Sequence, residues 1–269
     1  MNLDLAGRAA MIIGGARGIG RAIAVAFADE RANVAVIDLA AEVADVATEI
    51  GRRCGVQTLS LCDNVANFAA MQRAASVCRE RFGRIDHVVF AVGVGSGKYG
   101  FPFWNLEPAD WGRVLEINVL GAVHVAHAFA PYMVEARAGT MLFLSSIAGQ
   151  IGSQTDPPYS AAKAALINFA QCAAKDLAPH NVRVNTLCPG MVKTALNQSV
   201  WEAWQRQQPE DQRRSYEDWA GDKVRRLVPL GRWQDAEDIA AMAVVLASSQ
   251  AKNITGQTIN VDGGFVMHW

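Results

Sequence analysis

The side chains best suited to chemistry in this sequence are Tyr159 and Lys163. They stand four residues apart in the segment Tyr-Ser-Ala-Ala-Lys, and on a helix this spacing places both on one face as neighbours. A phenol ordinarily has a pKa of about 10, and a nearby ammonium favours its ionised form. The pair could therefore exchange a proton with a bound hydroxyl group, although most pairs of this kind are only a surface contact.

A serine adds to this signal. Ser146 follows a strand predicted over residues 140–145, and it precedes Tyr159 by 13 residues. Open α/β sheets bind their ligands beyond the carboxyl ends of their strands. The position therefore predicts that Ser146 lies in the same site as Tyr159 and Lys163.

A glycine-rich turn at 14–20 stands directly between a predicted strand and a predicted helix. Glycines allow the backbone to approach a pyrophosphate closely, and a helix N-terminus offers unpaired N–H groups and the positive end of a dipole. Such a turn alone is a weak signal, and the order strand, turn, helix is what favours a dinucleotide site. The residues expected to contact the dinucleotide here are Gly14, Arg17, Gly18, Ile19 and Gly20.

Asp38 ends the second predicted strand, 18 residues after Gly20. A carboxylate at this place can accept hydrogen bonds from the ribose hydroxyls of NAD and repels the 2′-phosphate of NADP. Leu39 follows it, so the next residue offers no cation for that phosphate, although Arg17 could reach it. The sequence therefore favours NAD, while a helix cap or a solvated strand end is the alternative for Asp38.

Strands and helices alternate along the chain. Strands are predicted at 9–13, 33–38, 56–61, 86–91, 140–145, 182–187 and 258–261. Helices are predicted at 19–30, 42–50, 67–82, 108–137, 159–177 and 236–247. Several strands are almost wholly apolar, as expected when helices cover both faces of a parallel sheet. We predict a single α/β domain over 1–269, a doubly wound Rossmann fold with about seven strands, in which 190–230 form a substrate lid.

Composition agrees with a globular protein. Of 269 residues, 51% are apolar and 19% charged, and the net charge of −1 gives no field that attracts nucleic acid or an anionic membrane. Basic residues at 213–226, Lys223 among them, are offset by acidic neighbours, which indicates a solvated helical face. We see no signal peptide, and the apolar stretches are interrupted before they reach the length of a membrane span.

Five cysteines without CxxC spacing indicate buried free thiols and a reducing, cytoplasmic location. His124 and His127 lie on one face of the long predicted helix, but no third ligand is evident. We therefore expect neither a disulfide framework nor a metal site.

Several motifs in sequence order resemble the classical short-chain dehydrogenase/reductase family. They are the turn at 14–20, Asn118, Ser146, Tyr159 with Lys163, Pro189-Gly190 and Asp262-Gly263-Gly264. The resemblance runs from Leu5 to the C-terminus and implies catalytic roles for four residues. Tyr159 would take the substrate hydroxyl proton as hydride leaves carbon, Ser146 would hold the substrate oxygen, and Lys163 would lower the pKa of Tyr159 and hold the nicotinamide ribose. Asn118 would hold a water of a proton relay.

The same resemblance implies further contacts with NAD. Asp63 and Asn64 would contact the adenine, and Gly93 follows the fourth strand near the cofactor. Pro189-Gly190, the Val192 backbone and the Thr194 hydroxyl would face the nicotinamide and a phosphate. The family usually has threonine where Ile13 stands and asparagine where Phe90 stands, and we expect these two apolar replacements to compensate each other.

Aromatic residues in the lid, Trp201, Trp204, Tyr216 and Trp219, suit an apolar or sugar-like substrate, or they pack the lid itself. With 228–232 and the ending 262–269, they resemble the polyol and vicinal-diol (sorbitol, acetoin) branch. We expect NAD-dependent hydride transfer between nicotinamide and a secondary alcohol or ketone such as a polyol, sugar or small diol. A ketoreductase for a bulkier hydroxyacyl or cyclic substrate and a non-catalytic dinucleotide sensor are the alternatives. The resemblance implies a homotetramer with long helices packed in pairs, and the alanine-rich faces at 122–130 and 161–174 would allow such close helix contact.

Overall fold

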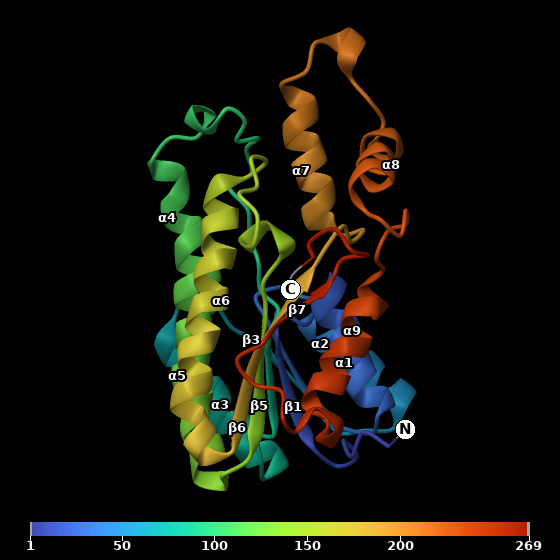
Figure 1. Cartoon of the computed structure of the whole chain (residues 1–269). Helices are drawn as coiled ribbons and strands as arrows, with labels where there is room; N and C mark the ends of the chain where they lie inside the picture. Colours follow the sequence, from blue (N-terminus) through green and yellow to red (C-terminus); the bar gives the residue numbers. More distant parts are fainter. Residues whose placement is uncertain (1, 268–269) are drawn as a thin grey trace.

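Within residues 2–267, which the computed structural model describes, seven strands form one parallel sheet (Figure 1). The strands are β1 (Ala9–Ile13), β2 (Asn33–Asp38), β3 (Thr58–Cys62), β4 (His87–Phe90), β5 (Gly139–Leu144), β6 (Val182–Pro189) and β7 (Thr258–Val261). Their order is β3-β2-β1-β4-β5-β6-β7, so the chain direction across the sheet reverses between β1 and β4. Ligands of such sheets bind at this reversal, and the predicted doubly wound fold is confirmed.

Helices cover both faces of the sheet (Figure 1). One face carries α1 (Gly18–Asp29), α2 (Val43–Cys54) and α9 (Ala236–Ala247). The other carries α3 (Phe68–Phe82), α5 (Gly121–Ala136) and α6 (Pro157–Leu177), with α4 (Ala109–Leu115) beside α6. The lid consists of α7 (Ala195–Arg206) and α8 (Tyr216–Leu227).

Strand β1 shows why a strand without polar residues suits this position. Its side chains alternate between the two faces, so Ile12 packs with α1 while Met11 and Ile13 pack on the α3 and α5 side. Every residue of β1 is buried. Both faces are apolar, as expected for a central parallel strand covered by helices on each side.

Several helix boundaries differ from the sequence expectation, and two of the helices concerned carry predicted site residues. Helix α6 begins at Pro157 rather than at Tyr159, because Asp156 caps it and proline is compatible with the first helical turn. The long helix predicted at 108–137 runs from Ala109 to Ala136 but contains a π-helical segment, Glu116–Leu120, which includes Asn118. Such π-bulges are frequent at functional sites.

The run Ala109–Ala136 is long and apolar enough to cross a membrane by length and composition, contrary to the sequence expectation. Its apolar residues have a different explanation here, because α5 packs on α3 and α4 packs on α6. Val125 and Phe129 are fully buried in the core on that side of the sheet. A core helix of a globular protein meets the same criteria.

The cysteines are free thiols, as expected, but they are not all buried. Cys54, Cys78 and Cys188 lie inside, whereas Cys62 and Cys172 are exposed. His268 and Trp269, which belong to the C-terminal ending used for the branch resemblance, lie outside the described residues.

Gly20 permits the close packing of α1 on the end of β1. A Cβ atom at this position would collide with the carbonyl oxygen of Gly14, which is backbone and cannot move aside easily. Gly112, in α4, has no atom within 4 Å of the corresponding Cβ position. The two glycines therefore form a matched pair for testing packing.

We predict that Gly20→Ala lowers the free energy of unfolding by about 1–3 kcal/mol, because it overpacks a backbone contact. Gly112→Ala should leave the free energy of unfolding unchanged or raise it by up to about 1 kcal/mol, because alanine is the better helix former. Denaturant unfolding followed by circular dichroism measures both. Equal stability of the two variants would contradict the packing described for Gly20.

Candidate active site

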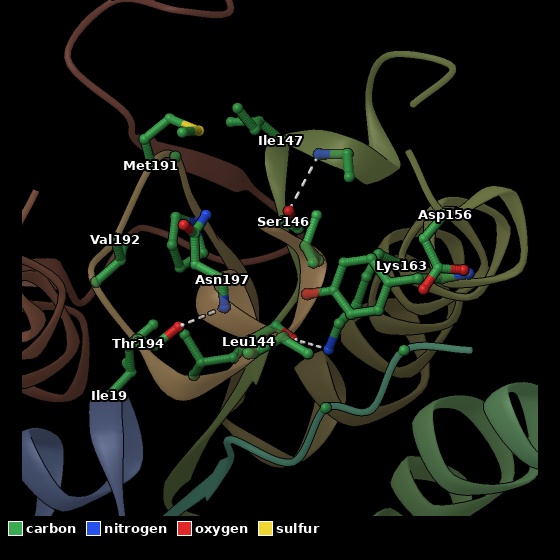
Figure 2. Close-up of a pocket in the computed structure, with 18 of the residues that line it drawn as sticks. Ile19, Leu144, Ser146, Ile147, Asp156, Lys163, Met191, Val192, Thr194 and Asn197 are labelled. Atoms are coloured by element: carbon green, nitrogen blue, oxygen red, sulfur yellow. Dashed lines mark hydrogen bonds between the residues drawn. The ribbon is translucent and has the colours of Figure 1, made fainter. Parts of the chain in front are cut away.

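A cavity of about 460 Å³ opens at the carboxyl ends of the central strands (Figure 2). The N-terminus of α1 forms one wall, the start of α6 another, and the lid helices contribute a third. The predicted site residues that line it are Arg17, Gly18, Ile19, Gly20, Gly93, Ser146, Tyr159, Lys163, Pro189, Gly190, Val192 and Thr194. The structure therefore brings together residues that are as far apart as 17 and 194 in the sequence.

The segment after β5 is held against α6 by two contacts. The Ser145 hydroxyl donates a hydrogen bond to the Lys163 carbonyl over 2.8 Å. Gly149 lies so close to α6 that a Cβ there would be 2.6 Å from the Lys163 carbonyl carbon. Ser146, between them, lines the same cavity as Tyr159 and Lys163, and its Oγ accepts a hydrogen bond from Ala148 N–H over 3.1 Å (Figure 2). The predicted convergence of serine, tyrosine and lysine is thus present.

The ammonium group of Lys163 is buried, with 2% of the residue exposed. It donates hydrogen bonds to the carbonyl oxygens of Leu144, over 2.8 Å, and Val92, over 3.3 Å (Figure 2). Burial lowers the pKa of Lys163 to about 8. Gly93 is needed beside it, because a Cβ there would approach Nζ to 3.3 Å.

Tyr159 is half-buried, and burial raises the pKa of its hydroxyl. The Ser146 side chain acts in the opposite direction, and the charge of Asp156 adds to the rise. Nζ of Lys163 lies 5.5 Å from the centre of the Tyr159 ring. Lys163 is not among the groups that lower this pKa, so the lowering expected from Lys163 would have to come together with the positive charge of an oxidised nicotinamide.

Asn118 uses its side chain to hold neighbouring backbone. Its Nδ2 donates hydrogen bonds to the carbonyl oxygens of Val94 and Val114, both over 2.8 Å, and its Oδ1 accepts from Val94 N–H over 3.4 Å. The residue is fully buried. The amide therefore braces the chain after β4, next to Gly93, and the role of Asn118 in a water relay stays a prediction.

The glycine turn has the shape that a pyrophosphate needs. Gly14 and Gly18 have φ values of +85° and +51°, which favour glycine. The first N–H groups of α1 are available there, because Arg17 provides no side-chain cap. Arg17 lines the cavity, and its exposed guanidinium pairs with Glu42; its predicted contact with the cofactor stays a prediction.

Three acidic or amide residues stand along the adjacent strand ends. Asp38 accepts hydrogen bonds from Ala16 N–H over 2.9 Å and from Ala40 N–H over 3.0 Å, which fixes its carboxylate beside the glycine turn. Asp63 lies 3.8 Å from Arg73, and exposed Asn64 caps its own turn through Ala66 N–H. Asp38, Asp63 and Asn64 do not line the cavity itself, and their predicted cofactor contacts stay predictions.

The segment after β6 also depends on a glycine. A Cβ at Gly190 would lie 2.6 Å from Gln234 Oε1 and 2.7 Å from Asp262. Val192 pairs with Gln234 through a β-bridge, and Thr194 caps α7 by accepting a hydrogen bond from Asn197 N–H (Figure 2). This segment therefore presents Val192 and Thr194 to the cavity opposite α1.

The two apolar departures from the family pattern are neighbours in the sheet. Ile13 pairs with Phe90 across β1 and β4, and both are fully buried in one core cluster. Apolar residues therefore stand at both positions together, and replacing both partners of a polar pair by apolar groups can be nearly neutral. That the two replacements compensate each other stays a prediction.

Asp156 is a residue of this site that the sequence reasoning missed. Its buried carboxylate accepts hydrogen bonds from Ser96 N–H over 2.8 Å and, as the cap of α6, from Tyr159 N–H over 3.5 Å. It lines the cavity, and burial raises its pKa. An aspartate before two prolines is a helix-start signal that could have revealed it.

The lid aromatics mainly pack on one another. Trp201 contacts Tyr216, Trp204 contacts Trp219, and Tyr216 contacts Trp233, with ring centres 5.8, 6.0 and 6.1 Å apart. Of the four predicted aromatics, only Trp219 lines the cavity. Lys223 lies beside it, so the sequence placement of this lysine on a solvated face was wrong.

Fold and site together define an oxidoreductase with a Rossmann dinucleotide-binding sheet, and comparisons with known proteins agree. The family model described as enoyl-(acyl carrier protein) reductase matches residues 14–266. D-threitol dehydrogenase of Mycolicibacterium smegmatis is 33% identical over 264 residues, which cover 98% of this chain and 94% of that protein. The chain therefore belongs to the short-chain dehydrogenase/reductase family.

Two solved structures extend the comparison. NAD⁺-bound xylitol dehydrogenase has a TM-score of 0.89 and 26% identity, covering 97% of this chain and 100% of its own. L-Sorbose reductase from Gluconobacter frateurii, solved with NADPH and L-sorbose, has a TM-score of 0.90 and 26% identity, covering 100% of both chains. Both are oxidoreductases with carbohydrate-like substrates in their names, and they carry different nicotinamide cofactors.

We predict that Tyr159→Phe lowers kcat about a hundredfold to ten-thousandfold, because it removes the proton-transfer group. The affinity for NADH, measured by fluorescence titration, should stay within about threefold, since the ring remains. Tyr132→Phe, on α5 and outside the cavity, is the control and should leave kcat unchanged. Substantial turnover by Tyr159→Phe would contradict the acid/base assignment.

Proposed function

We propose that the protein is an NAD-dependent dehydrogenase/reductase that interconverts a secondary alcohol and a ketone, with a polyol, sugar or small diol as substrate. The observation that carries this proposal is the convergence of Ser146, Tyr159 and Lys163 in a cavity whose opposite wall is the glycine turn. The glycine turn, the open N-terminus of α1 and the carboxylate of Asp38 fit a dinucleotide.

The bound nicotinamide would supply a hydride acceptor or donor. Tyr159 would take the hydroxyl proton of the alcohol as its carbon is oxidised, and would return it in reduction. Ser146 would hold the same oxygen by a hydrogen bond and stabilise its developing charge. Lys163, fixed by the Leu144 and Val92 carbonyls, would keep a positive charge near the phenolate.

Two features support NAD over NADP. The Asp38 carboxylate is fixed beside the glycine turn by two backbone N–H groups, where it would repel a 2′-phosphate. Arg17, which could have neutralised that phosphate, is paired with Glu42. The free negative charge of Asp38 and the neutralised positive charge of Arg17 therefore both favour NAD, which lacks the 2′-phosphate.

We predict that Asp38→Ala increases the ratio of kcat/KM for NADP to kcat/KM for NAD at least about tenfold, because it removes a like-charge repulsion worth several kcal/mol. Initial rates with both cofactors measure this ratio. Asp45→Ala, an exposed carboxylate on α2, is the control. An unchanged preference in Asp38→Ala would show that this carboxylate does not contact the ribose.

The substrate proposal is supported by the relatives named for threitol, xylitol and sorbose. NADH absorbance with a panel of polyols, sugars, diols and their ketones tests it, and turnover of several of these compounds is the expected result. Turnover only of hydroxyacyl thioesters or bulky cyclic ketones would favour the ketoreductase alternative, with which the name of the matching family model agrees. Tight NADH binding without any turnover would favour a dinucleotide sensor. The homotetramer and the cytoplasmic location stay predictions.

A further inference from the structure

The charged residues of α8 divide between two faces of the helix. Arg225 and Arg226 lie 3.8 and 2.9 Å from Asp222 on the outer face. Lys223 follows the opposite stripe, four residues from Trp219 and four from Leu227, and all three line the active-site cavity. One cation of α8 is thus directed into the cavity while its neighbours are paired outside it.

Lys223 has no anionic partner in the part of the chain that the structure describes. Its ammonium lies 3.7 Å from the centre of the Trp219 ring, and no carboxylate or carbonyl oxygen of residues 2–267 pairs with it. Lys98, by contrast, lies 2.8 Å from Asp110, and Lys163 has two carbonyl acceptors. Burial lowers the pKa of Lys223 to about 8, as expected for a cation that is partly removed from water without a counter-ion.

The surroundings of Lys223 restrict which anion could bind its ammonium group. Val200, Leu227 and Phe265 are apolar residues that line the same cavity. A dianionic phosphate would need several donors, whereas one ammonium in an apolar wall suits a single carboxylate. The phosphates of the dinucleotide belong to the glycine turn on α1, while Lys223 lies in the lid (Figure 1).

We propose that Lys223 binds a carboxylate of the substrate, so that the preferred polyol is one that carries a carboxylate, that is, a polyhydroxy acid, or its oxo acid. This inference rests on the proposed function and specifies its substrate class. In the oxidation, the C–H bond of the alcohol carbon would break and its electron pair would pass as hydride to bound NAD⁺. The hydroxyl proton would pass to the ionised oxygen of Tyr159, the carbonyl would form, and the carboxylate would stay unchanged on Lys223.

The test compares each polyol with the aldonic acid that has the same carbon number and stereochemistry, using initial rates with NAD. We expect the wild-type protein to have the higher kcat/KM for the acid. Lys223→Met should lower the ratio of kcat/KM for the acid to kcat/KM for the polyol about tenfold or more, mainly through KM, because it removes a charge-assisted hydrogen bond. Lys223→Arg should restore most of that ratio, since it keeps the charge.

Arg225→Met is the matched control, because it removes the same charge from the opposite face of the same helix. It should leave the ratio unchanged. A wild-type preference for the neutral polyol, or an equal loss for acid and polyol in Lys223→Met, would overturn the carboxylate site while leaving the proposed function intact. Equal effects of Lys223→Met and Arg225→Met would also overturn it, since the effect would then be that of net charge.

A binding measurement separates the two proposals if turnover is absent. Calorimetric titration of the protein–NADH complex with the aldonic acids should show binding that Lys223→Met weakens about tenfold and Arg225→Met does not. This result without turnover would contradict the proposed dehydrogenase while supporting the carboxylate site. Absence of binding together with turnover of neutral polyols would contradict the site alone.

Discussion

The site depends on one buried cation. The ammonium of Lys163 is removed from water and held by carbonyl oxygens of Leu144 and Val92, at the ends of two strands on the same side of the sheet. An unpartnered charge in this position would be costly, so the strand ends and α6 must keep their mutual distance for the ammonium to be satisfied. Helix α6 also carries Tyr159, and the position of the phenol is therefore fixed by the same interaction. The same hydrogen bonds of Lys163 therefore satisfy a buried charge and fix the position of the proposed proton-transfer group.

Close backbone approach is the second condition of the site. Gly93, Gly149 and Gly190 each bring one loop to a place that a Cβ would block, beside Lys163, against α6 and against Asp262 respectively. Asn118 adds hydrogen bonds that brace the loop containing Gly93, and it does so from a π-helical segment. These loops belong to different βα units, so the cavity forms only when all three loops pack closely against their neighbours. The side chains of Ser145, Asn118 and Lys163 all donate hydrogen bonds to backbone carbonyl oxygens, and in the proposed function Ser146 and Tyr159 are the groups left to face a substrate.

The lid is held together by interactions of a different kind from those that stabilise the sheet. Its two helices are joined by aromatic contacts and by the hydrogen bond from the Tyr216 hydroxyl to Asn197, and they contribute little to the central core. In the proposed function, chemistry and substrate choice are therefore located on separate structural elements. Helix α6 carries Tyr159 and Lys163 and the segment after β5 carries Ser146, while α8 supplies Trp219 and Lys223. Such a division allows relatives with one catalytic set to act on different substrates.

The sequence by itself determined the sheet, the glycine turn and the candidate catalytic residues Ser146, Tyr159 and Lys163. Apolar strands alternating with helices are a local pattern, and Tyr159, Lys163 and Ser146 stand at spacings that local geometry interprets directly. Only the tertiary structure decided which way the remaining polar groups face. Asp156 accepts a hydrogen bond from Ser96, 60 residues earlier in the chain, and Asn118 donates a hydrogen bond to the Val94 carbonyl. Lys223 lines the cavity although its sequence neighbours are charged. The orientations of these three side chains depend on contacts between segments far apart in the chain. The periodicity of one helix does not indicate which other element will pack against each of its faces.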